Sequence, residues 1–262
     1  MRSIWKGAVS FGLVTIPVAL FSATEDRTPK FKMLRGADGS PIKYKRVAEA
    51  DGQEVTWEEI VKGFEVEKGT YVTFTDDELA AASAKAGAKL VDVVQFVDAS
   101  EIDPMYYKSS YFLAPERTGV KAYRILIGAL EDGDKVGIAK VAIREKQQLA
   151  TIRAKDGVLV LETMYWPDEI RKPEFEELDV DVEIRSEEVA MATMLIENMT
   201  RPFDESEYVD QTRERISELA QQKLEGQEIV VPEAPEPTKV VDLLEALKAS
   251  VEATKSAKKA AS

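Results

Sequence analysis

Basic side chains at alternating positions are the residues of this chain whose types and spacing suggest chemistry. In the run 138–146 (IAKVAIREK), Ala139, Val141 and Ile143 alternate with other residues, and the run 149–155 (LATIRAK) repeats the pattern. Successive side chains of a strand point to opposite faces of a sheet. If the two runs form a hairpin, the apolar residues share the core face, and Glu145 is the one acid near the other face. The residues predicted to share that outer face are Lys140, Arg144, Lys146, Thr151, Arg153 and Lys155.

An anionic partner is the simplest explanation of such a face, because like charges on paired strands destabilise a sheet. An ordinary lysine-rich surface is the alternative, and the pattern alone leaves it open. Cations scattered over strands suit contacts to the phosphates of a duplex, which hold nucleic acid without reading its sequence. No helical stretch carries the arginine, asparagine and glutamine pattern that reads base edges in a major groove.

Two further basic clusters lie near the amino terminus, one around Phe31 and one around Tyr44, and the second is predicted to lie on a strand. Residues 1–46 hold nine basic and three acidic residues, a net charge of +6, although the whole chain has a net charge of −13. Basic islands in an acidic protein predict one cationic surface, with acidic residues elsewhere that repel polyanions. The residues of this part that are predicted to contact DNA are Lys30, Lys32, Arg35, Lys43, Lys45 and Arg46.

The chain contains no cysteine and no histidine. The first absence excludes disulfides, thiolate nucleophiles and zinc–thiolate sites, and the second removes most metal sites and every histidine-based triad. Phosphate-cradling glycine loops and nucleophile-elbow motifs are absent as well. We therefore predict no catalytic residue, no metal and no cofactor. With no signal segment and no apolar run long enough to span a membrane, the sequence predicts a cytoplasmic protein.

Short runs of β-branched and aromatic residues, separated by Gly, Asp and Pro, fill most of the chain before residue 185, which is typical of a barrel or a sandwich. The predicted strands are 72–75, 90–97, 123–127, 136–144, 149–155 and 158–164. A helix is predicted over 76–86, with Asp76 as its N-cap.

Helices replace strands toward the carboxyl terminus. Ser186 is predicted to cap a helix whose apolar stripe ends at Met199, and Asp204 with Glu207 predicts a capping box for a second helix, which Gly226 ends. These helices either pack on the barrel or form a dimer arm, and the pattern favours neither. The predicted parts are a β core over 1–185, a helical arm over 186–230 and an appendage over 231–262.

The appendage begins with 231–238 (VPEAPEPT), whose prolines and acids predict an extended, semi-rigid linker. Beyond it, Val240, Leu244, Leu247 and Val251 fall on one face of a short amphipathic helix. Such segments often dock into a groove on a partner. The alternative is that this helix folds back on its own domain.

Several motifs, in the same order along the chain, resemble bacterial Ku proteins. They are 4–24 (IWKGAVSFGLVTIPVALFSAT), 44–47 (YKRV), 102–104 (IDP), 110–113 (SYFL), 149–153 (LATIR), 166–171 (WPDEIR), 191–192 (MA) with 195–196 (LI), and 223–226 (KLEG). The resemblance covers roughly residues 2–230, and 241–247 (VDLLEAL) also fits.

The resemblance implies a mixed α/β, mainly β fold, with a Ku-type β-barrel core, a helical C-terminal arm and a short tethered C-terminal helix. It implies a symmetric homodimer that encloses duplex DNA in a preformed ring, and hence sequence-independent binding of double-stranded DNA ends without catalysis. It also implies partnership with an ATP-dependent DNA ligase D in non-homologous end joining, through the C-terminal segment. An acidic interaction scaffold that does not touch nucleic acid is the alternative function.

The sequence departs from one family pattern. Some Ku proteins carry a Cys-x-x-Cys knuckle, but here Val47 is followed by Ala48 and then by Asp51-Gly52. Asp-Gly is a good tight-turn pair. We therefore predict a plain hairpin at this point, without a metal.

Overall fold

The protein is described by a computed structural model that covers residues 1–84, 89–143, 146–227 and 250–251. The chain divides into two compact units. The first consists of Met1–Arg27 and Lys32–Lys172, and the second of Thr28–Phe31 and the chain from Pro173 onward.

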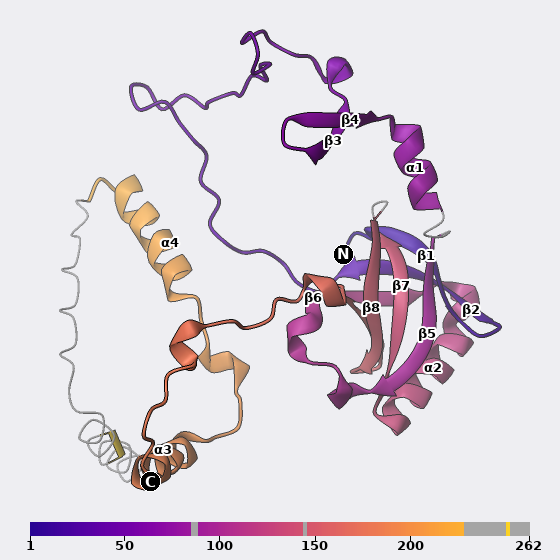
Figure 1. Ribbon diagram of the computed structural model, residues 1–262, viewed down its shortest axis with the longest axis vertical. Helices are drawn as coiled ribbons and strands as arrows, with labels where there is room; N and C mark the ends of the chain where they lie inside the picture. Colours follow the sequence, from indigo (N-terminus) through magenta and orange to yellow (C-terminus); the bar gives the residue numbers. More distant parts are fainter. Residues whose placement is uncertain (85–88, 144–145, 228–249, 252–262) are drawn as a thin grey trace. The chain divides into compact units, whose positions relative to one another are not determined.

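A closed β-barrel forms the centre of the first unit (Figure 1), with the strand order β1-β2-β6-β9-β8-β7-β5. Neighbouring strands are antiparallel except β1 and β5, which pair in parallel and close the barrel. The predicted mainly β barrel is therefore confirmed. The strands are β1 (Trp5–Phe11), β2 (Val14–Ser22), β5 (Leu90–Asp98), β6 (Tyr107–Pro115), β7 (Lys135–Ile143), β8 (Lys146–Lys155) and β9 (Val158–Met164).

Alternating apolar residues from all seven strands fill the barrel. The predicted core face of β7 is confirmed, since Ala139, Val141 and Ile143 are buried, and Ile152 of β8 is buried with them. The largest fully buried apolar side chains are Val9, Ile16, Val18, Leu20, Val91, Leu113, Val141, Ile152, Leu159 and Leu161.

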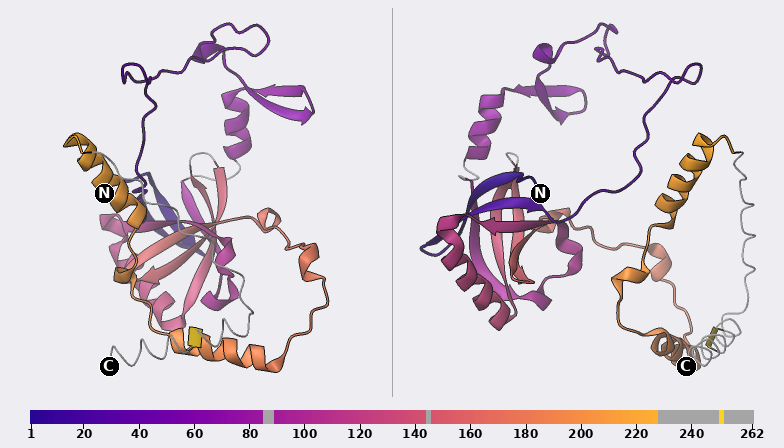
Figure 2. Two further views of the ribbon diagram at one scale, coloured as in Figure 1. Left: turned by 90° about the vertical axis from the view of Figure 1, so that its left-hand side faces the viewer. Right: turned by 180° about the vertical axis from the view of Figure 1, so that it is seen from behind.

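The prediction of a strand over 123–127 is wrong, because these residues belong to α2 (Val120–Gly133). The buried residues Tyr123, Leu126, Ile127 and Leu130 recur at helical spacing and pack on the barrel core. The Tyr123 hydroxyl donates a hydrogen bond to the Leu113 carbonyl at 2.5 Å and accepts one from the Leu159 N–H at 2.8 Å. α2 lies against the barrel (Figures 1 and 2), and these two bonds fix it there. Burial raises the pKa of the Tyr123 phenol.

The chain between β2 and β5 contains β3 (Lys62–Glu67), β4 (Thr70–Phe74) and α1 (Asp76–Ala84). The strand predicted around Tyr44 is not formed, and only isolated antiparallel bridges join Leu34 to Pro41 and Val47 to Glu54. Of the predicted plain hairpin only the turn and this second bridge are formed, with Gly52 at φ +71° and its N–H bonded to the Ala48 carbonyl at 2.8 Å.

The predicted N-cap of α1 is one residue out. Thr75, not Asp76, occupies the cap: its hydroxyl accepts a bond from the Glu78 N–H at 3.2 Å, and the Glu78 carboxylate accepts one from the Thr75 N–H at 2.8 Å. The Thr75 N–H and the Thr75 hydroxyl, which both donate to the Glu78 carboxylate, lower the pKa of Glu78. The far end of the predicted helix 76–86 lies partly outside the described residues.

The second unit contains the helices α3 (Ser186–Met199) and α4 (Gln211–Leu224). Ser186 is the first helical residue rather than the cap, and the Glu188 carboxylate accepts a bond from the Arg185 N–H at 3.0 Å. Asp204 caps only the short 3-10 turn Glu205–Glu207, whereas Asp210 caps α4. Gly226 follows α4 at φ +73°, as predicted for its terminator.

Short 3-10 turns connect the remaining elements, at Trp57–Glu59, Ala99–Glu101, Pro104–Tyr106, Arg117–Gly119, Pro167–Glu169 and Glu176–Leu178. Among the described residues, no helix is long and apolar enough to cross a membrane.

Gly7 lies where β1 and β5 close the barrel. A Cβ at this position would overlap the Lys89 carbonyl oxygen and the Trp5 ring, and the neighbouring Ala8 N–H donates a hydrogen bond to the same carbonyl at 2.9 Å. The closure therefore requires a residue without a side chain.

We predict that Gly7→Ala destabilises the barrel by about 2–3 kcal/mol, because the added methyl group forces β1 away from Lys89. Gly128→Ala is the matched control, since a Cβ there meets nothing within 4 Å and alanine favours the helix by up to about 1 kcal/mol. Urea unfolding followed by circular dichroism measures both. Equal midpoints for the Gly7 variant and the unchanged protein would contradict the closure argument.

Candidate nucleic-acid interface

Arg153 and Glu162 form a two-pronged ion pair on the outer face of β8 and β9. The Arg153 Nε lies 2.8 Å from Glu162 Oε2, and its Nη2 lies 2.9 Å from Oε1. The Arg153 side chain is 32% exposed and that of Glu162 is 12% exposed. The expectation that Glu145 is the one acid near this face is therefore wrong, because the adjacent strand supplies Glu162.

Polar groups surround this ion pair. Ser110 on β6 donates a hydrogen bond to Glu162 at 3.3 Å. The hydrogen bonds that Arg153 donates to Glu162 raise the pKa of the Arg153 guanidinium. Burial, and then the charge of Glu162, raise the pKa of the nearby Tyr107 phenol. Thr151, predicted to face outward, is fully buried, and its hydroxyl has no hydrogen-bond partner among the described residues. Arg153 thus belongs to a cluster that holds three strands together.

Strand register also changes the predicted place of Lys146. Ile143 and Lys146 are directly paired across the β7–β8 turn, so Lys146 shares the side of the sheet on which Ile143 is buried. It is exposed because it lies at the end of the barrel. The sequence placed it on the outer face by continuing the β7 alternation through residues 144–145. Arg144 lies outside the described residues.

Lys140 and Lys155 lie on the outer face as predicted, and both are exposed. Lys140 stands beside Leu149 on one neighbouring strand and Asp92 on the other. Lys155 borders a hollow of about 400 Å³ that is also lined by Arg153, Phe112 and other residues of the barrel wall. The described part of the chain supplies no ion-pair partner for either lysine.

Three of the basic residues predicted between β2 and β5 are engaged within the chain. Arg35 pairs with Asp38, with its Nε 2.9 Å from Oδ1, and this contact holds the pKa of Asp38 well below its usual value. Lys45 lies 2.6 Å from Glu54, and the Arg46 guanidinium lies 3.9 Å from the centre of the Trp57 ring.

The remaining predicted cations of this part are Lys30, Lys32 and Lys43, all exposed. For Lys32 and Lys43, the described residues provide no ion-pair partner. A search of the described residues for groups of three or more acidic, histidine or cysteine side chains that could hold a metal finds none.

Comparison with known proteins matches residues 10–191 to the family model of the Ku70/Ku80 beta-barrel domain. A relative from Frankia casuarinae is 44% identical over 97% of this chain, which spans 64% of that relative. Relatives from Heliobacterium modesticaldum and Archaeoglobus fulgidus are 42% and 41% identical, over 99% and 97% of this chain and 94% and 100% of their own lengths. All three carry the name non-homologous end joining protein Ku.

The chain belongs to the Ku family. Within this Ku barrel, Glu162 is the residue of the outer face that sequence reasoning missed. The strand around it reads VLVLETM, and a single carboxylate in so apolar a run was a usable signal for a buried partner. Its partner could not be named without the register of β8 on β9.

We predict that Arg153→Ala lowers the free energy of unfolding of this Ku barrel by about 2 kcal/mol, because Glu162 is left in the wall without its counter-ion. The expected loss is below the ~3–5 kcal/mol of a fully buried pair, since part of the Arg153 side chain reaches water. Lys155→Ala is the matched control on the same strand and is expected to change stability by less than about 0.5 kcal/mol. Equal urea midpoints for the two variants would show that the pair does not stabilise the wall. Joint replacement, Arg153→Met with Glu162→Leu, should recover most of the loss.

Proposed function

We propose that this chain binds the ends of double-stranded DNA as a homodimeric ring and does not read their sequence. In this proposal it protects the ends and recruits and stimulates an ATP-dependent DNA ligase in non-homologous end joining, without catalysing a reaction itself. The observation that carries the proposal is similarity over nearly the whole chain to relatives named for end joining.

The exposed lysines support contact with phosphates rather than with bases. Lys32, Lys43, Lys140, Lys146 and Lys155 are exposed and have no ion-pair partner in the described part of the chain. A lysine ammonium is a flexible point charge, which suits a phosphate whose exact position varies with sequence. The ion-paired Arg35, Lys45 and Arg153 are less available.

The topology around the barrel supports an enclosing ring. The chain leaves the barrel at Ser22, at the end of β2 that lies toward the start of β6. It returns at Leu90, next to Val91, which pairs with Val141 near the end of β7. Both connections lie at the same barrel end. A long segment anchored twice at one end is suited to pass around a duplex about 20 Å wide, and two-fold symmetry would complete the closure.

Exposed apolar side chains support a homodimer. In the β3–β4 hairpin every residue is exposed, including Phe64 and Tyr71, and an isolated two-stranded hairpin is marginal in water. On α3, Val189, Ile196 and Met199 are exposed although they form its apolar stripe. A second copy that covers these surfaces would supply the missing burial.

The ligase partner, DNA ligase D, remains a proposal for the C-terminal segment. Of its predicted docking face, Val240, Leu244 and Leu247 lie outside the described residues. Val251 is described and is only 7% exposed. This burial supports packing on the chain itself at that position, so a docking ligase would use the segment upstream of Val251 or displace it.

We predict that the protein binds linear duplex and leaves relaxed closed circles of the same sequence largely unbound, because a closed ring loads only where a duplex terminates. A gel-shift comparison of the two DNAs at two salt concentrations measures this. Equal affinity for both forms would remove the threading mechanism, and failure to bind either would favour an acidic scaffold that does not touch nucleic acid.

We predict that Lys140→Gln with Lys155→Gln weakens binding to all duplex sequences alike. Each lost phosphate contact should lower the slope of log affinity against log salt by ~0.9. The control is Lys172→Gln with Lys223→Gln, which removes the same charge at exposed positions outside the barrel wall and outside segment 23–89. If both double variants share the unchanged slope, the two outer-face lysines do not contact the duplex.

A further inference from the structure

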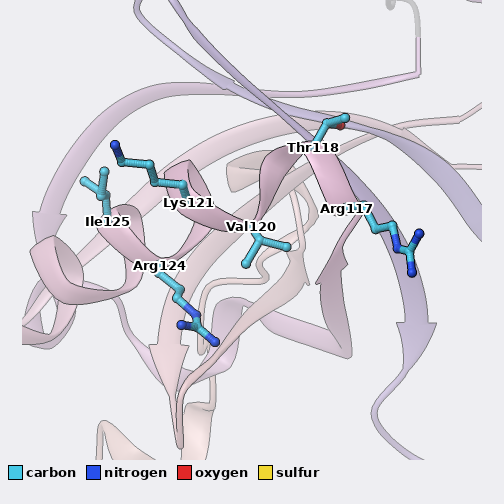
Figure 3. Close-up of a pocket in the computed structure, with 6 residues that line it drawn as sticks. All are labelled: Arg117, Thr118, Val120, Lys121, Arg124 and Ile125. Atoms are coloured by element: carbon cyan, nitrogen blue, oxygen red, sulfur yellow. The ribbon is translucent and has the colours of Figure 1, made fainter.

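The exposed side of α2 carries three cations that are not among the residues predicted to contact DNA. Arg117, in the turn that leads into the helix, is followed by Lys121 and Arg124 at intervals of four and three residues, which places them on neighbouring turns. Together with Thr118, Val120 and Ile125 they line a hollow of about 610 Å³ (Figure 3).

Packing on the opposite side of the helix prevents this basic face from turning inward. Tyr123, Leu126 and Leu130 are buried in the barrel core, and the Tyr123 hydroxyl is bonded to backbone groups of both β6 and β9. Rotation of α2 would break these bonds and expose the apolar stripe. The three cations are therefore held on the surface by the fold.

The described part of the chain provides no ion-pair partner for Arg117, Lys121 or Arg124. The acids of the same segment are Glu116, just before the turn, and Glu131 with Asp132 near the far end of the helix. Like charges three and four residues apart on a helix repel each other. An anionic partner would relieve this repulsion.

An apolar side chain lies within the basic face. Ile125 is 63% exposed, although α2 has buried positions for its other large aliphatic residues. A nucleic-acid backbone offers phosphates and sugars to such a surface and would leave Ile125 without an apolar partner. A peptide that combines carboxylates with a leucine-like side chain matches both features.

Strand direction separates this face from the proposed DNA-enclosing segment. α2 joins the end of β6 to the start of β7, next to Pro17 and Asp98. The segment 23–89 leaves and re-enters at the other end of the same strands. A partner on α2 would therefore approach the barrel from the end opposite the connections of that segment.

We propose that the basic face of α2, formed by Arg117, Lys121, Arg124 and Ile125, is a docking surface for an acidic peptide segment of a partner protein. The cations pair with carboxylates, and Ile125 with Val120 receives an apolar side chain between them. This surface is independent of the proposed binding of DNA ends, so either can fail without the other.

The test uses the full chain and a fluorescein-labelled peptide that repeats two glutamates and a leucine. The triple variant Arg117→Glu, Lys121→Glu, Arg124→Glu should bind this peptide about tenfold more weakly than Arg171→Glu, Lys172→Glu, Lys223→Glu, which carries the same net charge and lies outside segment 23–89. Fluorescence anisotropy measures both. All six positions are exposed, so the two variants should unfold at the same temperature as the unchanged protein.

A second variant tests the apolar part of the surface. Ile125→Ser should weaken binding of the leucine peptide several-fold but leave binding of a serine-substituted peptide unchanged. Equal peptide affinities for the two triple variants would overturn the proposal. Loss of linear duplex binding in the α2 triple variant beyond that of its matched control would assign the face to DNA and overturn it as well.

Discussion

The short parallel pairing of β1 with β5 is the constraint on which the rest of this structure depends. Three residue pairs, from Ala8 with Leu90 to Ser10 with Asp92, turn an open sheet into a barrel. A parallel pair cannot be joined by a tight turn. Here β2, antiparallel to β1, returns the chain to the barrel end at which β5 begins, so the segment between β2 and β5 leaves and re-enters at one end. The close approach of Lys89 to Gly7 fixes where that connection ends. Closure of the barrel and anchoring of the long segment are thus the same event, and a side chain at Gly7 would disturb both.

The outer face of the barrel carries two kinds of cation that the sequence alone does not distinguish. Arg153 is held by two hydrogen bonds to Glu162 and has lost most of the freedom that a phosphate contact would use. Lys140 and Lys155 lie on the same face and remain exposed. Arginine forms the structural pair because its planar fork matches a carboxylate, whereas lysine keeps its strongly hydrated charge in water. A basic face is therefore better described by its unpaired lysines than by its total charge.

Sequence reasoning succeeded where short-range periodicity decides the structure. Alternation gave the core faces of β7 and β8, and Asp51-Gly52 gave a turn. It failed at 123–127 because YRILI has the composition of a strand, whereas the apolar spacing that makes it a helix extends from Tyr123 to Leu130. Other errors came from strand register. Lys146 was predicted on the outer face, but β7 ends at Ile143 and Lys146 pairs with it, so Lys146 lies on the other side of the sheet. Glu162 is recognisable as the partner of Arg153 only from the pairing of β9 with β8. The site as a binding surface stays a prediction, because phosphate contacts leave no pattern that an ordinary exposed lysine lacks.

Net charge determines how such a chain can meet a polyanion. With a net charge of −13, the molecule as a whole repels DNA, so attraction has to come from local surfaces within about one Debye length, roughly 8–10 Å in physiological salt. Lysines on the barrel wall and cations fixed on α2 lie on different elements of the same barrel, and the acidic surface elsewhere discourages nonspecific coating by either kind of anion. A carboxylate peptide carries a much lower charge density than a duplex, so it needs apolar contact as well as charge. Ile125 supplies such a contact beside the cations of α2, whereas Lys140 on the wall stands between Leu149 and the acidic Asp92. The chemistry of the two surfaces therefore suits the two different partners proposed for them, even though both surfaces are basic.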